Sequence, residues 1–76
     1  MRRKVLKRMG RSYRVVSPFV AIKSVEDGHK TITIPAGSQI QVCGEVQKSG
    51  LVDVELNGEI VAVFMRDIDS RAKRLE

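Results

Sequence analysis

The chain has 76 residues, the size of one small domain, and its formal net charge is +5. Its single cysteine excludes a disulfide within the chain, and no stretch approaches the roughly 20 apolar residues of a membrane span. Because no apolar signal-peptide core follows the basic N-terminus, we expect a cytoplasmic protein.

The positive charge is concentrated at the N-terminal end. Residues 1–14 hold seven basic residues and no acid, whereas residues 15–65 hold three basic and six acidic residues. We divide the chain into a basic arm, residues 1–12, which we expect to be flexible, and a single domain, residues 13–76. The cations of this end are our candidate ligands for a DNA or RNA backbone: Arg2, Arg3, Lys4, Lys7, Arg8, Arg11 and Arg14.

The domain begins with two predicted strands. Apolar residues at 13–16 indicate a short strand, and those at 19–25 indicate a second one. Pro18 lies between them, as expected of a residue that cannot donate a backbone hydrogen bond to a sheet. Residues 26–29 form a predicted turn, in which Gly28 takes a positive φ and His29 is an exposed loop residue.

The stretch from residue 30 to residue 65 has the clearest β pattern. Polar and apolar residues alternate at 31–34, 39–42 and 52–56, which places one set on each face of a strand. One face should therefore be buried and the other solvated, as in antiparallel sheets. The apolar residues that we expect to share a core are Ile32, Ile34, Ile40, Val42, Val52, Val54 and Leu56.

Turn signals separate these strands. The dipeptide Asn57-Gly58 predicts a type I′ hairpin turn, because both of its residues tolerate positive φ. Residues 35–38 and 47–50 are the other predicted turns. The apolar run at 60–65 is either a strand buried on both faces or a buried helix; its β-branched residues and the preceding hairpin favour the strand, with Phe64 pointing inward.

Two alternatives remain for residues 66–76. In one, Asp67 and Asp69 cap a short helical turn, which continues through residues 70–73. In the other, Ile68 plugs the open end of a barrel, and residues 71–75 pair as a last strand.

The sequence contains no catalytic constellation. It has no phosphate-binding glycine loop, no Cys/His set with metal-ligand spacing and no nucleophile signature. We interpret Cys43 as a small residue on a strand, because nothing nearby in the sequence would clearly activate its thiol. We therefore expect no enzyme, no metal, no cofactor and no small-molecule substrate.

The strand spacing, the hairpin at Leu56-Asn57-Gly58-Glu59 and the helical turn at 66–69 resemble an SH3-like small β-barrel over about residues 13–75. This fold-level resemblance implies an all-β domain of about five short antiparallel strands, with one short helical turn near the C-terminus. Peptide-binding SH3 domains use a row of surface aromatics to hold proline-rich segments. This chain has only three aromatic residues, so we do not expect that activity.

The resemblance extends to bacterial SH3-like modules of ribosomal and transcription proteins, whose basic tails contact RNA or DNA. An OB-like barrel is the nearest alternative fold. A swapped-hairpin transcription regulator dimer, suggested by Thr33-Ile34-Pro35, is another. Fold alone does not choose among the functions of these proteins.

Three functions remain open. The first is a nucleic-acid module of low sequence specificity that binds through the arm, joined by Arg71, Lys73 and Arg74 if the chain ends lie together. The second is a protein-interaction module, an adaptor or an inhibitor, that uses an acidic face made of Asp53, Glu55 and Glu59. The third is a subunit of an oligomeric enzyme, since residues 40–43 faintly resemble a motif of plasmid-type dihydrofolate reductases.

Overall fold

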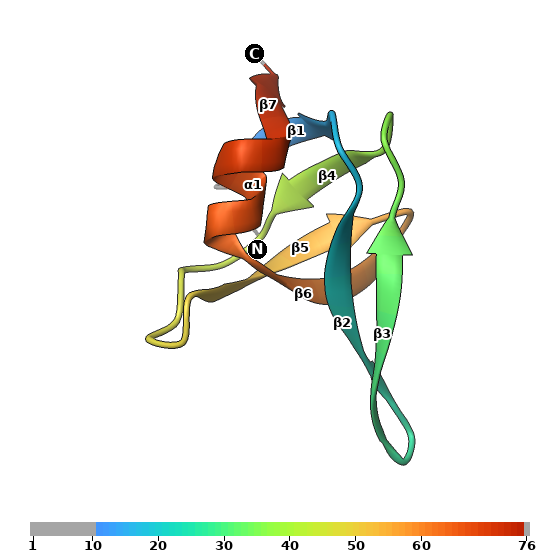
Figure 1. Ribbon diagram of the computed structural model, residues 1–76. Coiled ribbons are helices and arrows are strands. Elements are labelled where there is room, and N and C mark those ends of the chain that lie inside the picture. The colour runs from blue at the N-terminus through green and yellow to red at the C-terminus, as the bar shows by residue number, and fades with distance from the viewer. Residues whose placement is uncertain (1–10, 76) are drawn as a thin grey trace, which may run out of the picture.

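The computed structural model describes residues 11–75, which form one antiparallel sheet and one short helix (Figure 1). The elements follow one another as β1 (Ser12–Val15), β2 (Phe19–Val25), β3 (Gly28–Ile34), β4 (Gln39–Val42), β5 (Leu51–Leu56), β6 (Glu59–Phe64), α1 (Met65–Arg71) and β7 (Ala72–Leu75). The predicted strands at 19–25 and 39–42 have these bounds, and the strand predicted at 13–16 lies one residue earlier.

The strands are hydrogen-bonded in the order β3-β2-β6-β5-β4-β1-β7. Within the described residues, β3 pairs only with β2 and β7 only with β1, so the sheet is open and has two edges. We had predicted a barrel of about five strands, whereas the sheet has seven and does not close. Figure 1 shows the β2–β3 hairpin running steeply across the direction of β4 and β5, so the sheet is strongly twisted.

The core lies on the inner face of this twisted sheet. Of the seven predicted core residues, four are fully buried, and Ile32, Val42 and Leu56 are partly buried against them. The period of two therefore identified the buried face of β3, β4 and β5. The complete buried set is Tyr13, Val15, Phe19, Ala21, Ile34, Ile40, Val52, Val54, Val61, Val63 and Ile68.

Strand β6 is buried on one face only. Val61 and Val63 are in the core, whereas Ile60 and Phe64 are 56% and 40% exposed. The apolar run is therefore a strand, as predicted, but the expectation of burial on both faces and of an inward Phe64 was wrong. Once Val61 and Val63 face the core, the pleat places residues 60, 62 and 64 on the opposite face, which no element of the described chain covers.

The β5–β6 hairpin has the predicted turn. Leu56 pairs with Glu59, and the two residues between them have φ values of 53° (Asn57) and 85° (Gly58), as a type I′ turn requires. This turn fixes the register of β5 against β6, so Val52 and Val54 lie beside Val63 and Val61 in the core.

Helix α1 is held by its buried face and by backbone contacts at its ends. Ile68 is fully buried, the Met65 amide donates to the Gly50 carbonyl at 2.9 Å, and the Ala72 amide donates to the Ile68 carbonyl. Phe64 is the N-cap and no side chain caps the helix, so the capping role predicted for the two aspartates was wrong. The predicted helical turn at 66–69 is confirmed by α1. The burial of Ile68 and the final strand β7 agree with the other alternative, apart from the closed barrel.

Candidate functional site

Strands β1 and β7 bring the two ends of the described chain together. They are antiparallel neighbours, with Ser12 opposite Leu75 and Arg14 opposite Lys73. Since Tyr13 and Val15 point into the core, Arg14 points outward, and both Arg14 and Lys73 are exposed. We call the cations of this region the basic edge; they are Arg11, Arg14, Arg71, Lys73 and Arg74.

Arg14 and Lys73 are like charges placed directly opposite each other on one face. Residues in this relation have Cβ atoms about 4.5–5.5 Å apart, and like charges there are destabilising. On its other side Arg14 lies opposite Gln39, which is neutral. Two ion pairs of the described residues, Lys23 with Glu59 and Arg71 with Asp67, involve neither Arg14 nor Lys73. A bound anion would therefore relieve repulsion that this pair of strands creates.

The predicted nucleic-acid ligands divide into two groups. Arg2, Arg3, Lys4, Lys7 and Arg8 lie outside the described residues. Arg11 and Arg14 belong to the sheet region: the Arg11 carbonyl accepts a 2.9 Å hydrogen bond from the Val42 amide, and Arg14 is part of β1. β1 pairs with β4 on one side and β7 on the other, so Arg14 is held by an interior strand.

The three predicted acidic residues do not share a face. Asp53 and Glu55 alternate with buried valines on β5 and point outward. Glu59 lies opposite Leu56, on the core side of the sheet, and its Oε1 atom is 2.9 Å from Nζ of Lys23. The acidic face therefore consists of Asp53 and Glu55, whereas Glu59 joins β6 to β2 at the end of the hairpin.

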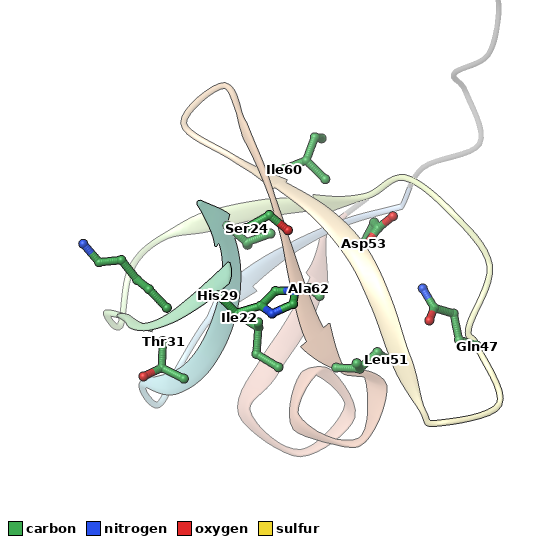
Figure 2. Close-up of a pocket in the computed structure, with 11 residues that line it drawn as sticks. Ile22, Ser24, His29, Thr31, Gln47, Leu51, Asp53, Ile60 and Ala62 are labelled. Atoms are coloured by element: carbon green, nitrogen blue, oxygen red, sulfur yellow. The ribbon is translucent and has the colours of Figure 1, made fainter. Parts of the chain in front are cut away.

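The outer face of β2, β6 and β5 is hollowed into an open groove of about 920 Å³. The groove has an apolar floor, with Ile22 of β2 directly opposite Ala62 of β6. Figure 2 shows the imidazole of His29 beside these two residues, with Asp53 and Gln47 on the β5 side. The lining residues of this outer-face groove are Ile22, Ser24, His29, Lys30, Thr31, Gln47, Leu51, Asp53, Ile60, Val61 and Ala62.

The groove combines apolar and polar lining residues. An apolar floor with a few polar groups at the rim (His29, Gln47 and Asp53) is the usual composition of a binding site. Within residues 11–75 no three His, Cys, Asp or Glu side chains are grouped as metal ligands. The sequence did not predict the groove, because it depends on the outward residues of β6, which we expected to be buried.

Cys43 is exposed and lies near the acidic face. Partial burial, followed by the nearby carboxylates of Glu55 and Asp53, raises the pKa of its thiol. Its Sγ atom lies 3.5 Å from the Gln41 carbonyl, to which it donates a weak hydrogen bond. A raised pKa keeps the thiol protonated, which is the opposite of the activation that a nucleophilic cysteine needs.

Comparison with known proteins found no matching family model, no matching curated protein and no matching solved structure. In the part of the chain that the structure describes, no helix has the length and apolar character needed to cross a bilayer.

Proposed function

We propose that this protein is a small non-enzymatic module that binds the phosphate backbone of DNA or RNA. The observation that carries the proposal is the placement of Arg14 directly opposite Lys73, where two neighbouring strands present like positive charges on one face. The proposal takes the sheet to be SH3-like, which the Asn57-Gly58 hairpin and the short helix before the last strand support.

The basic edge and the basic arm are continuous along the chain. β1 begins at Ser12, directly after the segment that holds Arg2, Arg3, Lys4, Lys7 and Arg8. A phosphate backbone that occupies the edge would therefore run close to residue 11, the first described residue of the arm. Each phosphate neutralised by a lysine or arginine releases counterions, so binding should weaken steeply as salt rises.

We expect this binding to have little sequence preference. Stacking of bases on exposed aromatic rings is the usual device of single-strand binding proteins. Here Tyr13 and Phe19 are buried, and Phe64 lies on β6, away from the basic edge. Contacts to phosphate fix the position of the nucleic acid but carry no sequence information.

The test is fluorescence anisotropy of labelled duplex DNA and single-stranded RNA at low salt. The full chain is compared with Arg14→Gln/Lys73→Gln and with a control of equal charge, Lys23→Gln/Lys48→Gln, whose sites lie outside the basic edge and outside β3. We expect the first variant to lose about tenfold in affinity, and the control to lose much less. Equal losses would contradict a role for the basic edge, and no binding by the full chain would remove the proposal.

A second candidate function is protein docking in the outer-face groove. This proposal replaces the predicted acidic face by the groove that lies beside it. The observation that favours it is the apolar floor beside Asp53 and Glu55, which fits a segment with apolar and basic side chains. Asp53→Lys and Ile60→Ser should each abolish binding of such a partner. A complex that survives both substitutions would exclude the groove as its binding site.

A further inference from the structure

Strand β3 presents an unpaired backbone edge of seven residues. It pairs with β2 along its whole length, from Gly28 to Ile34, and no other described strand covers its outer side. Its first four residues are exposed, and it contains no proline, which would block a further strand. An edge of this length and composition is a template for the addition of another strand.

We propose that two copies of this chain pair through β3, antiparallel to each other about a two-fold axis at Thr31. The two sheets then become one continuous sheet with β7 at each end. This interface is self-complementary and closes at two copies, because each chain contributes its single free β3 edge. The proposal does not depend on the nucleic-acid function.

The sequence of β3 selects this register. Outward residues of one copy must lie beside outward residues of the other, so the axis passes through a residue. An axis at Lys30 would place two lysines opposite each other, which is destabilising. An axis at Ile32 would pair only residues 30–34. An axis at Thr31 pairs all seven residues of the strand.

With the axis at Thr31, no like charges face each other. Lys30 of one copy lies opposite Ile32 of the other, and His29 lies opposite Thr33. At the axis itself, two threonines face each other, a favourable cross-strand pair. Because His29, Lys30 and Thr31 also line the outer-face groove, the second copy's Thr33 would extend the rim of that groove.

Charge complementarity beyond the ladder supports the same register. The tip of the β2–β3 hairpin carries Glu26 and Asp27. Continued by two residues, the register places this acidic tip opposite Pro35 and Ala36 of the second copy. The tip of each chain would therefore lie against the turn between β3 and β4 of the other.

That turn is attached to the basic side of the fold. The Gly37 amide donates to the Val15 carbonyl at 2.7 Å, and the Val15 amide donates to the Ser38 carbonyl at 2.8 Å. The next amide, that of Val16, donates to the Arg71 carbonyl at 2.7 Å. The acidic tip of one copy would thus approach the part of the other that carries Arg71 and Arg14. This complementarity favours a second copy over an unrelated extended peptide.

The test is sedimentation velocity of the full chain over a wide concentration range, with substitutions at the proposed axis. We expect a reversible dimer, and we expect Thr31→Lys and Thr31→Glu each to raise its dissociation constant by about tenfold or more, because like charges meet at the axis. Mixing the two variants should restore a dimer. Gln41→Lys, an equal charge change on an exposed residue of β4, should leave the dimer unchanged.

Cross-linking tests the register separately. In a Cys43→Ser background, Thr31→Cys should form a disulfide-linked dimer on oxidation, whereas Thr33→Cys should not, since its two copies would lie four residues apart along the ladder. Circular dichroism confirms that each variant is folded. A chain that stays monomeric at every concentration, a dimer that tolerates charge at Thr31, or cross-linking through Thr33 instead would overturn the proposal.

Discussion

The two edges of the sheet are built in opposite ways. β7 has four residues, two of them cations, and helix α1 leads directly into it. β3 has seven residues, alternates threonine with isoleucine over its second half, and carries Lys30 as its one cation. Charged residues and short length are the features by which natural sheets prevent strand addition. β7 has both of them, whereas β3 lacks the short length.

The two edges of one sheet therefore offer different kinds of binding surface. At β7 the surface consists mainly of charged side chains, which suit an anion. At β3 it consists mainly of free backbone N–H and C=O groups, which suit another strand. Four strands separate β7 from β2 in the hydrogen-bonded order.

Removing the anchor of β7 should have the largest effect. Ile68 is the fully buried residue of α1, so Ile68→Ala should cost about 2–5 kcal/mol. A chain of this size has only about 3–5 kcal/mol of net stability, so the variant should be largely unfolded. Urea titration followed by circular dichroism measures this loss. Ile60→Ala, the same change at an exposed position, should cost less than about 1 kcal/mol; equal losses would contradict the assignment of Ile68 to the core.

Reversing one charge of the basic edge should change binding and stability in opposite directions. Arg14→Glu places a carboxylate opposite Lys73, which should stabilise the fold by about 0.2–1 kcal/mol. The same change should weaken polyanion binding by about tenfold or more, because a repulsive charge replaces a phosphate ligand. Thermal unfolding and anisotropy measure the two effects.

Lys48→Glu is the matched control for this variant, since it makes the same change of charge in the loop between β4 and β5. It should weaken binding only slightly and should not stabilise the fold. If Arg14→Glu stabilises the fold but does not weaken binding, Arg14 and Lys73 repel each other but do not bind the polyanion.

Between the two edges, the reactivity of Cys43 reports on the acidic face. Because its pKa is raised, the thiolate fraction near pH 8 is smaller than for an ordinary cysteine, and alkylation should be slow. Glu55→Gln removes one cause of the shift, so it should lower the pKa and accelerate alkylation by iodoacetamide. The acceleration should be modest, since burial is the larger cause. Glu26→Gln, at the tip of the β2–β3 hairpin, should have no effect.

The smallest effect should come from the ion pair that joins the β2–β3 hairpin to β6. Nζ of Lys23 is 2.9 Å from Oε1 of Glu59, but the two side chains are 35% and 57% exposed, so solvent screens the interaction. Glu59→Gln should cost less than about 1 kcal/mol by urea titration. A larger loss would mean that the hairpin carrying β3 depends on this one contact.

Local patterns predicted most of the strands. The alternation at 39–42 and the Asn57-Gly58 turn follow from neighbouring residues alone, and both are as the sequence indicated. The orientation of β6 could not be read in this way, because a continuous apolar run does not show which of its two faces is covered. Phe64 was therefore placed inward, and the outer-face groove beside it was missed.

The basic edge depends on pairing between distant parts of the chain. Residues 14 and 73 lie opposite each other only because β7 returns to the outer side of β1. The sequence indicated that the C-terminal cations would join the binding surface only if the chain ends lay together. No local signal specifies pairing between residues so far apart in the sequence. The structure provides that pairing and also makes Arg14 part of an interior strand.

The slope of log affinity against log salt concentration tests the central claim most directly. It is measured by anisotropy on one duplex DNA for the full chain and for Arg14→Gln/Lys73→Gln. If both residues contact phosphates, the variant should have a slope smaller in magnitude by about two, because two fewer counterion releases accompany binding. An unchanged slope would show that neither residue contacts the backbone and would contradict the assignment of the basic edge as the nucleic-acid surface.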